Sequence, residues 1–270
     1  MGGMIMPIAL VTGASMGIGA AFARALAARK YDLVLVARSQ DKLGMLSHEL
    51  MTDYGITAKV WVADLTVPTA AQDVFNAVKS WGWQVDLLVN NAGFGDYAPF
   101  VRCDRAKQIS MIQLNVLALT ELTHLFLPGM VDRKSGSIIN VASIAGLQSL
   151  PYLSVYAATK AFVVSFSESL WAEVKSTGVK VQALCPGSTE SNFAIVAGMD
   201  QMMEGSTKEP PKIATAESVV QESLAALEQN EPIVVTGIGN RFVSAIGRFV
   251  PRKTLVGWVE QVFRPKVANS

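Results

Sequence analysis

Short apolar runs alternate with amphipathic helical stretches along most of the chain, and this alternation restricts the possible folds more than any other feature. Helices between successive strands bring each strand back in the same direction, through right-handed β-α-β crossovers into a parallel sheet. The runs are apolar almost throughout, as expected for strands that are buried on both faces. The seven runs are 8–13, 32–38, 58–65, 85–93, 136–143, 179–187 and 232–237. The sequence therefore predicts an α/β fold, a single doubly wound domain with a seven-stranded parallel sheet and helices on both faces.

The predicted helices fill the gaps between these runs. They cover 17–30, 39–55, 69–81, about 104–131, about 153–177 and about 216–229. Ser39 is a plausible N-cap for the second helix, and Gly55 ends it. We see no linker and no repeat, so residues 1–240 are assigned to one domain and 241–270 to a tail. Irregular structure is expected over about 188–215 and beyond 240.

Charge and cysteine usage exclude several classes of protein. The formal net charge is +1, whereas a nucleic-acid-binding domain needs a basic surface, so no nucleic-acid partner is expected. Cys103 and Cys185 stand in no metal-binding or Cys-x-x-Cys spacing, which predicts no metal site and two reduced cysteines in a cytoplasmic protein. The first residues lack the basic region of a signal peptide, and no apolar run is long enough to span a bilayer.

A glycine-rich loop, TGASMGIG at 12–19, follows the first run and begins the first helix. Glycines there let the backbone approach a phosphate, and the helix N-terminus offers free N–H groups and the positive end of its dipole. The spacing differs from the Gly-x-Gly-x-x-Gly fingerprint of the standard dinucleotide motif. A tight strand–helix turn is the alternative, but the position at the start of the sheet favours a Rossmann-like dinucleotide site. The expected cofactor contacts in this loop are Gly13, Ser15, Met16, Gly17, Ile18 and Gly19.

The end of the second run indicates which dinucleotide is bound. An acidic residue there would bond the ribose 2′-hydroxyl of NAD, whereas an arginine accommodates the 2′-phosphate of NADP. Arg38 and Ser39 follow the run, and no carboxylate stands at that turn. We therefore expect NADP(H), with NAD disfavoured, and assign Arg38 and Ser39 to the cofactor. A surface arginine at a strand end is the alternative.

Further motifs occur in a fixed order along residues 8–237. They are Asp64-Leu65, Asn90-Asn91-Ala92-Gly93, Asn115, Ser143, Tyr156-x-x-x-Lys160 and Pro186-Gly187. Each is weak alone, but the ordered set together with the glycine loop is highly specific. On these motifs the chain resembles the short-chain dehydrogenase/reductase superfamily. It is similar to poorly characterised bacterial reductases and to hydroxysteroid and long-chain 3-ketoacyl reductases.

The resemblance implies cofactor contacts beyond the glycine loop. These are Asp64 and Leu65 at the adenine, Asn91, Ala92, Gly93, Pro186 and Gly187 along the cofactor, and Thr189 and Ser191 at the nicotinamide carboxamide. The chain departs from the family at two positions. Ser191 stands where the family often has threonine, and Met16 where NADP-preferring members often carry a basic residue, so the NADP preference depends on Arg38 alone.

Tyr156 and Lys160 stand four residues apart, which places them on one face of a helix with Cβ atoms about 5–6 Å apart. Reduction of a ketone by hydride transfer leaves an alkoxide-like oxygen, and a phenol with a pKa of about 10 can donate the proton that this oxygen needs. For alcohol oxidation the phenol must accept a proton, and we expect the Lys160 ammonium and an oxidised nicotinamide together to lower its pKa. For the pentapeptide alone, a half-buried tyrosine near a lysine is the alternative.

The resemblance implies roles for two further residues and a second role for the lysine. Ser143, at the end of the fifth run, would bond and orient the substrate oxygen. Asn115 would hold a water that connects to Lys160 for proton relay, although a solvent-facing asparagine is the alternative from its sequence neighbours. Lys160 and Tyr156 would also contact the cofactor, Lys160 at the nicotinamide ribose.

Apolar residues near the expected site predict the substrate class. The segment 188–215 is expected to form a lid, and its methionines can adapt to irregular shapes. A bulky apolar ketone or aldehyde is therefore expected, although the methionines could also pack on the protein itself. Asp96 and Tyr97 either touch the substrate or belong to a solvated loop. The residues assigned to the substrate are Phe94, Tyr152, Met199, Met202 and Met203.

The tail combines basic and large apolar side chains. Residues 241–266 contain six basic residues and one acidic residue, Glu260. A basic amphipathic helix of this kind can lie on a membrane surface, which predicts possible peripheral membrane contact. A tail that packs on its own domain or on a neighbouring subunit is the alternative. The resemblance also implies a homodimer or homotetramer built on the two long helices.

Two functional classes stay open from the sequence. We favour an NADP(H)-dependent oxidoreductase that interconverts an apolar ketone or aldehyde and its alcohol, with Tyr156 as general acid/base. Within this class, a 3-ketoacyl-thioester or hydroxysteroid reductase is the alternative. The second class is a non-catalytic NADP-binding regulatory protein, because fold alone does not determine function. The joint presence of Ser143, Tyr156 and Lys160 argues against it, since a sensor needs no such set.

Overall fold

Seven parallel strands form one sheet in the order β3-β2-β1-β4-β5-β6-β7. The computed structural model describes residues 6–190, 193–199, 213–247 and 250–265. The strands are β1 (Ile8–Thr12), β2 (Asp32–Ala37), β3 (Ala58–Val62), β4 (Val85–Asn90), β5 (Gly136–Val141), β6 (Val179–Cys185) and β7 (Ile233–Val235). The predicted doubly wound α/β fold is confirmed, with the strand order reversing its direction between β1 and β4.

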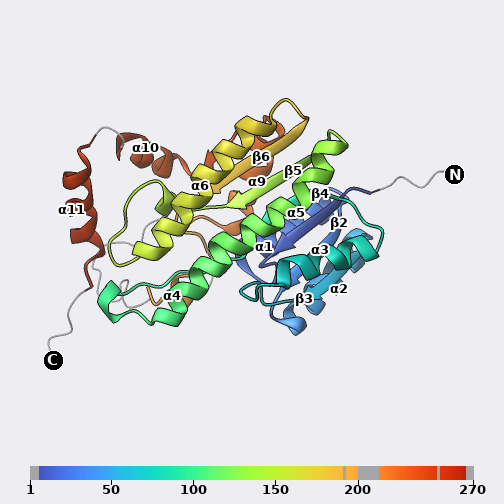
Figure 1. Cartoon of the computed structure of the whole chain (residues 1–270), viewed down its shortest axis with the longest axis horizontal. Coiled ribbons are helices and arrows are strands. Elements are labelled where there is room, and N and C mark those ends of the chain that lie inside the picture. The colour runs from blue at the N-terminus through green and yellow to red at the C-terminus, as the bar shows by residue number, and fades with distance from the viewer. Residues whose placement is uncertain (1–5, 191–192, 200–212, 248–249, 266–270) are drawn as a thin grey trace.

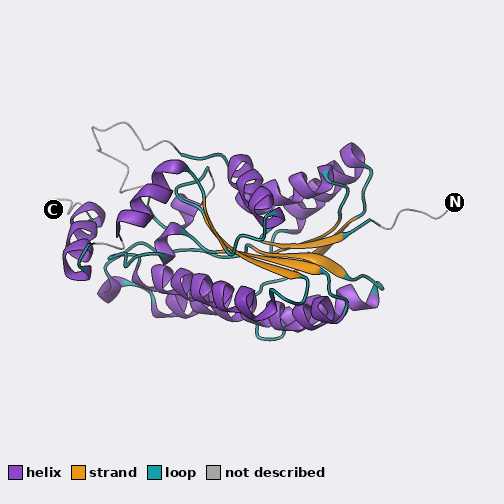
Figure 2. Cartoon of the chain, turned by 90° about the horizontal axis from the view of Figure 1, so that it is seen from above, coloured by secondary structure: helices purple, strands orange, loops and turns teal. Residues whose placement is uncertain are grey.

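Helices cover both faces of the sheet, which forms the middle layer in Figure 2. On one face, α1 (Gly17–Ala28), α2 (Gln40–Tyr54) and α9 (Ala216–Glu228) build a core with β1 and β2. On the other face lie α3 (Ala70–Ser80), α5 (Leu119–Asp132) and α6 (Ser154–Val174). Apolar side chains alternate between the two layers along β1, where Ala9 and Val11 face one core and Leu10 the other.

The strands end earlier than their apolar runs predict, and the remaining residues form the loops at the carboxyl edge of the sheet. The run 85–93 ends as a strand at Asn90, and the run 136–143 ends at Val141. The run 179–187 ends as a strand at Cys185. Three of the sequence motifs thus lie in loops at one edge, which is where ligands bind in open α/β sheets.

The predicted helix over 104–131 is one continuous helical stretch with a change of geometry inside it. It consists of α4 (Arg105–Ile112), the π-helical turn η2 (Gln113–Ala118) and α5. Among the described residues, this stretch is the one helix long and apolar enough to cross a membrane by length and composition, which the apolar runs of the sequence did not indicate. Because α5 packs Leu122, Phe126 and Met130 into the sheet core, the length and apolar composition of this stretch are those of a core helix.

The expectation of irregular structure beyond 240 is wrong. Residues Ile238–Gly247 form α10 and Arg252–Phe263 form α11. Figure 1 places α11 at the end of the molecule opposite the N-terminus, beyond the carboxyl edge of the sheet. Pro251 is the N-cap of α11, so the proline marks the start of a helix and not a loop. A short helix, α7 (Phe193–Val196), lies inside the segment expected to form a lid.

Candidate active site

In the loop between β1 and α1, the glycines stand at positions where a side chain would be strained or would not fit. Gly13 and Gly17 have φ angles of +63° and +55°, which favour glycine. A Cβ added to Gly19 would lie 2.2 Å from the carbonyl oxygen of Gly13. The loop therefore brings bare backbone and the N-terminus of α1 to the carboxyl edge of the sheet, as phosphate binding requires.

A clamp that the sequence did not indicate holds this loop to the end of β4. The Thr12 hydroxyl accepts hydrogen bonds from the backbone N–H groups of Asn91 and Ala92, at 2.9 and 3.0 Å. The Asn91 amide in turn donates to the carbonyl oxygens of Thr12 and Gly13, at 2.8 and 3.2 Å. Thr12 directly precedes Gly13, but nothing in its local sequence indicates a bond to a segment 79 residues away.

Arg38 lies exposed just beyond β2, as expected for a group that meets a ligand from solution. Asp64, beyond β3, is also exposed, and hydrogen bonds from Thr66 lower the pKa of its carboxyl, with a further contribution from the charge of Arg38. The structure thus brings a carboxylate near Arg38 from the neighbouring strand, although none stands at the same turn in sequence. Leu65 is buried. Ser39 is the N-cap of α2, and Gly55, with a φ of +65°, is its C-cap.

Ser143, Tyr156 and Lys160 meet beyond β5. Ser143 follows the strand, and its hydroxyl accepts a hydrogen bond from the Ala145 N–H at 3.1 Å. Tyr156 and Lys160 lie in the first two turns of α6 and are 7% and 5% exposed. The Lys160 ammonium donates to the carbonyl oxygen of Val141 at 2.7 Å and lies 5.8 Å from the centre of the Tyr156 ring. The pentapeptide alternative of a half-buried tyrosine is therefore excluded.

Burial dominates the ionisation of both groups. It raises the pKa of Tyr156 to about 12, while the hydrogen bond with Ser143 acts in the opposite direction. It lowers the pKa of Lys160 to about 8. The lowering of the Tyr156 pKa that we expect for alcohol oxidation needs the oxidised nicotinamide as well as Lys160, whose ammonium is directed here at the Val141 carbonyl. The phenol therefore holds its proton across the neutral range, as a proton donor must.

Asn115 is fully buried, so the alternative of a solvent-facing asparagine is wrong. It lies in the π-helical turn η2, a kind of irregularity that is frequent at functional sites. Its side chain exchanges hydrogen bonds with the backbone of Phe94, at 3.1 and 3.0 Å, and donates to the Thr159 hydroxyl at 3.1 Å. A Cβ on Gly93 would lie 2.9 Å from the Asn115 side-chain oxygen and 3.4 Å from the Lys160 nitrogen. Gly93 is thus close to both the Asn115 amide and the Lys160 ammonium.

The loop after β6 carries the next expected contacts. The carbonyl oxygen of Pro186 accepts a hydrogen bond from Ile144 N–H at 3.0 Å, which ties this loop to the residue after Ser143. A Cβ on Gly187 would lie 2.3 Å from the Asn240 side chain of α10. Thr189 is half-buried and donates to the Gly187 carbonyl at 3.0 Å. Ser191 lies outside the described residues.

An apolar cluster surrounds Tyr156 on the outer side of the site. The Tyr156 and Phe193 rings lie 5.0 Å apart between centres, and Phe94 and Met199 pack in the same cluster. Tyr152 packs its ring edge against Tyr97 at 6.3 Å. Met202 and Met203 lie outside the described residues, as do 191–192 and 200–212 of the expected lid. Asp96 accepts hydrogen bonds from Lys107 and Gln108, so its side chain joins the loop after β4 to α4.

Comparisons with known proteins agree with this geometry. The family described as short chain dehydrogenase matches residues 7–201. A very-long-chain 3-oxoacyl-CoA reductase from Anas platyrhynchos is 40% identical over 184 residues, which cover 66% of this chain and 58% of that protein. The matched part is thus little more than half of the length of that relative.

Two solved structures are similar over nearly the whole chain. The first is a short-chain dehydrogenase from Sphingobium yanoikuyae in complex with NADPH, with 30% identity, a TM-score of 0.80 and 98% of each chain covered. The second is the bulky-bulky ketone specific alcohol dehydrogenase from Comamonas testosteroni, with 27% identity, a TM-score of 0.77 and 99% and 98% coverage. The match of residues 7–201, most of the chain, shows that this protein belongs to the short-chain dehydrogenase family.

Proposed function

We propose that the protein is an NADP(H)-dependent oxidoreductase that interconverts an apolar ketone or aldehyde and its alcohol. The observation that carries this proposal is the group formed by the half-buried Ser143 and the buried Tyr156 and Lys160, which lies at the same edge of the sheet as the glycine loop. A protonated phenol, a hydroxyl and an ammonium together suit the transfer of a proton to a carbonyl oxygen.

The glycine loop and the strand ends have the shape that a dinucleotide requires. The space next to Gly13 and Gly19 admits no side chain, and the backbone there is fixed by the Thr12 and Asn91 clamp. When bound, NADPH would supply the hydride. The residues that would hold it are Gly13, Ser15, Met16, Gly17, Ile18, Gly19, Arg38, Ser39, Asp64, Leu65, Asn91, Ala92, Gly93, Tyr156, Lys160, Pro186, Gly187, Thr189 and Ser191.

The side chains beyond β5 would then complete the reaction. Ser143 would bond the substrate oxygen and orient it toward the Tyr156 phenol, which donates the proton as the oxygen gains negative charge. Lys160, kept charged below its pKa of about 8, would stabilise the phenolate that remains. Asn115, which is fixed by its hydrogen bonds to the Phe94 backbone, would hold the water through which Tyr156 and Lys160 regain a proton.

The substrate class follows from the apolar cluster around Tyr156. Phe94, Phe193 and Met199 line the outer side of the site and offer no charged partner to a substrate. By their names, two relatives act on carbonyl compounds with a large apolar part, a very-long-chain 3-oxoacyl-CoA and a bulky ketone. A 3-ketoacyl-thioester or hydroxysteroid reductase therefore stays as the narrower reading of the same chemistry.

The test of the proposed function is the oxidation of NADPH, followed by absorbance, with a series of apolar ketones and aldehydes of increasing size. Turnover with at least one compound supports an enzyme. Tight NADPH binding with no turnover of any compound would instead favour the non-catalytic regulatory protein. NADH in place of NADPH measures the cofactor preference in the same assay.

Replacement of the arginine beyond β2 should remove the preference for NADPH. Arg38→Ala takes away the one guanidinium that we place at the 2′-phosphate, and charge-assisted hydrogen bonds of this kind are the strong ones. We expect the Kd for NADPH to rise by about 10- to 100-fold while the Kd for NADH changes little, measured by fluorescence titration. Arg29→Ala, at the far end of α1, is the control. Equal losses for both cofactors would show that Arg38 serves structure and not recognition.

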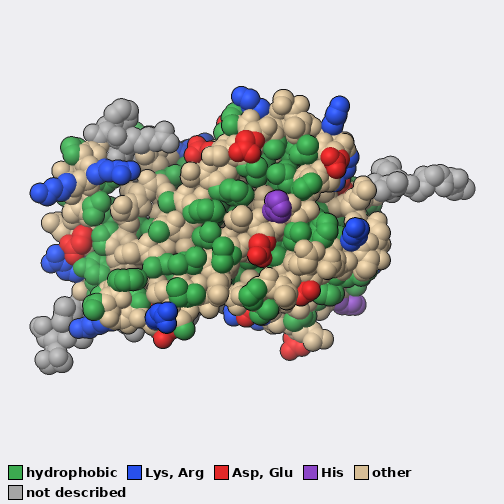
Figure 3. Space-filling model, viewed as in Figure 1, with side chains coloured by type: hydrophobic (Ala, Val, Ile, Leu, Met, Phe, Trp, Pro, Cys, Tyr) green, Lys and Arg blue, Asp and Glu red, His purple; other side chains and the backbone are tan. Residues whose placement is uncertain are grey.

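We also propose peripheral membrane contact through the C-terminal helices. Ile238 and Phe242 of α10 are 86% and 68% exposed, and Trp258 and Val262 of α11 are 57% and 68% exposed. Lys and Arg side chains lie along the same end of the molecule in Figure 3. Apolar and basic side chains exposed together are suited to an anionic lipid surface. Arg248, Phe249 and Lys266 of the tail lie outside the described residues.

The expected result is that the protein sediments with phosphatidylglycerol vesicles at low salt and that Phe242→Ser/Trp258→Ser weakens this binding at least about tenfold. Met45→Ser is a matched control, because Met45 is an exposed apolar residue on α2 at the other end of the molecule. Equal binding of all three proteins to the vesicles, or no binding by the wild type, would contradict the proposal that these helices carry the membrane contact.

The exposed faces of α4, η2 and α6 support assembly with further copies of the chain. Ile109, Ile112, Leu117 and Phe162 are between 38% and 53% exposed there, and Phe162 stacks on Phe166. Exposed apolar patches of this kind mark interaction sites. We propose a homodimer or homotetramer. Light scattering would measure it against the 28.9 kDa chain mass, and a monomer would exclude it.

A further inference from the structure

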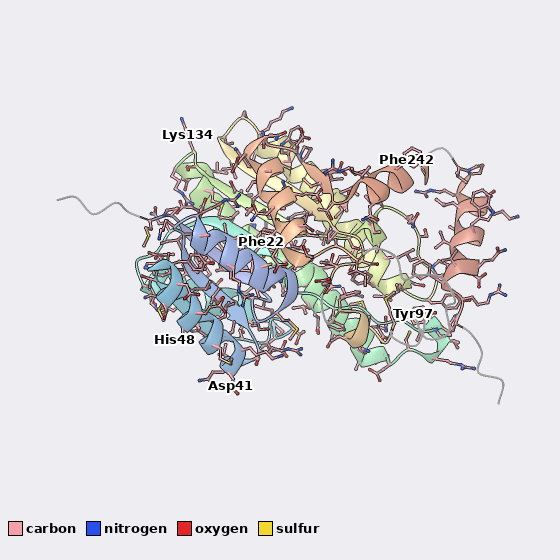
Figure 4. The ribbon with its side chains drawn as sticks, turned by 180° about the vertical axis from the view of Figure 1, so that it is seen from behind. Phe22, Asp41, His48, Tyr97, Lys134 and Phe242 are labelled. Carbon is pink, nitrogen blue, oxygen red and sulfur yellow. The ribbon has the colours of Figure 1, made fainter. Side chains whose placement is uncertain are left out.

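Helix α11 lies beside the candidate active site and contacts the loops around Tyr156. The Tyr97 hydroxyl, in the loop after β4, donates to the backbone carbonyl of Phe263 at 2.7 Å. The Tyr152 hydroxyl, four residues before Tyr156, donates to the Glu260 carboxylate at 2.5 Å. Both bonds join α11 to the apolar cluster, and Figure 4 shows Tyr97 at the end of the molecule that carries α11.

The two tyrosines form one unit. Their rings meet edge to face, with centres 6.3 Å apart. The Tyr152 carbonyl accepts a hydrogen bond from Ala98 N–H at 2.9 Å, which ties its backbone to the same loop. Tyr152 also has a φ of +66°, a conformation that is uncommon for a residue with a side chain and that the surrounding contacts must hold. Such strain is typical of functional sites.

Apolar side chains of α11 complete this contact. Val259 and Phe263 pack against the cluster that contains Phe94, Met199 and Tyr156. Glu260 lies on the same side of the helix and also pairs with Arg264 through two hydrogen bonds of 2.8 Å. Trp258 and Val262 lie on the other side and are exposed. One face of α11 therefore belongs to the active-site cluster, and the other faces solvent.

We infer that α11 is the outer wall of the substrate site, held by Tyr97 and Tyr152, and that it sets the length of the apolar carbonyl compounds that the site accepts. The inference rests on the proposed function and adds the element that decides specificity. Tyr152, which the sequence assigned to the substrate, is in this view a positioning residue that acts through α11. Val259 and Phe263 are the side chains that meet the far end of the substrate.

The test uses Tyr97→Phe/Tyr152→Phe, which removes two hydroxyl oxygens and keeps both rings and their packing. Hydrogen exchange of the α11 backbone amides should become at least about tenfold faster, the order expected for the loss of two hydrogen bonds. The probes for specificity are alkyl phenyl ketones from acetophenone to octanophenone. The ratio of kcat/KM for octanophenone to that for acetophenone should rise at least about fivefold in the variant.

Two further variants complete the design. Phe263→Ala shortens the wall itself and should raise the same ratio, whereas Tyr54→Phe, which removes a hydroxyl from α2, should change neither the ratio nor the exchange of α11. Unchanged exchange in the double variant, or faster exchange with an unchanged ratio, overturns the inference. If the wild-type protein reduces no ketone of the series, the proposed function fails, and the exchange result still decides whether the tyrosines hold α11.

Discussion

Tyr156→Phe is expected to lower kcat by about a thousandfold with any ketone that the protein reduces. General acid catalysis contributes about 10²–10⁴-fold, and the phenol is the one proton donor that we place at the substrate oxygen. The ring should stay in place, because Phe193 and the rest of the apolar cluster surround it and a phenylalanine fits the same space. NADPH oxidation at saturating cofactor is the measurement.

Two controls separate chemistry from folding in this experiment. The Kd for NADPH should change by less than about threefold, and the melting temperature should change little, since the variant removes one hydroxyl and keeps the ring and its packing. Tyr31→Phe removes a hydroxyl beyond α1 and should keep full turnover. A Tyr156→Phe protein with more than a tenth of the wild-type kcat would show that another group donates the proton.

Gly19→Ala should abolish cofactor binding. A Cβ there would lie 2.2 Å from the Gly13 carbonyl oxygen and 2.6 Å from the Asn91 side-chain nitrogen, and both atoms belong to the clamp between β1 and β4. The loop must shift to admit the methyl group, which costs about 1–3 kcal/mol of folding free energy and removes the backbone from its phosphate-binding position. We expect the Kd for NADPH to rise at least about 100-fold in a fluorescence titration, with a lower denaturation midpoint.

Gly44→Ala is the matched control for this substitution. Gly44 lies in α2, its backbone has no positive φ, and an added Cβ would meet nothing within 4 Å. Alanine is the better helix former by about 1 kcal/mol, so this variant should be slightly more stable and should bind NADPH as the wild type does. If Gly19→Ala binds NADPH with the wild-type Kd, the glycine loop is not the phosphate site.

The topology could be predicted from the sequence because local patterns determine it. Apolar runs separated by helices allow few arrangements, and the crossover rule reduces them to a parallel sheet. The roles of Asn91 and Ser143 came from the family resemblance, whereas the pattern of runs predicted only that Gly13 and Ser143 stand at strand ends. Their convergence is a consequence of parallel strands, whose carboxyl ends share one edge.

Contacts between distant segments could not be predicted. Nothing in the local sequence indicates that the Thr12 hydroxyl bonds the backbone beyond β4, because that bond depends on the approach of two strands 79 residues apart. The approach of Asp64 to Arg38 likewise depends on the pairing of β2 with β3. For the tail, the sequence left open a membrane-surface helix or packing on its own domain, and α11 packs Val259 and Phe263 against its own domain.

The bond between Tyr97 and Phe263 spans 166 residues, and this separation has a consequence for how the protein matures. A chain made from its N-terminus can assemble the sheet, the glycine loop and the helix of Tyr156 before its last helix has been synthesised. During that interval the apolar cluster around Tyr156 lacks the cover of Val259 and Phe263. Because α11 is made after the sheet and the glycine loop, this apolar surface is covered late in synthesis. Premature termination before Arg252 should yield a protein that has its glycine loop but aggregates through the uncovered site.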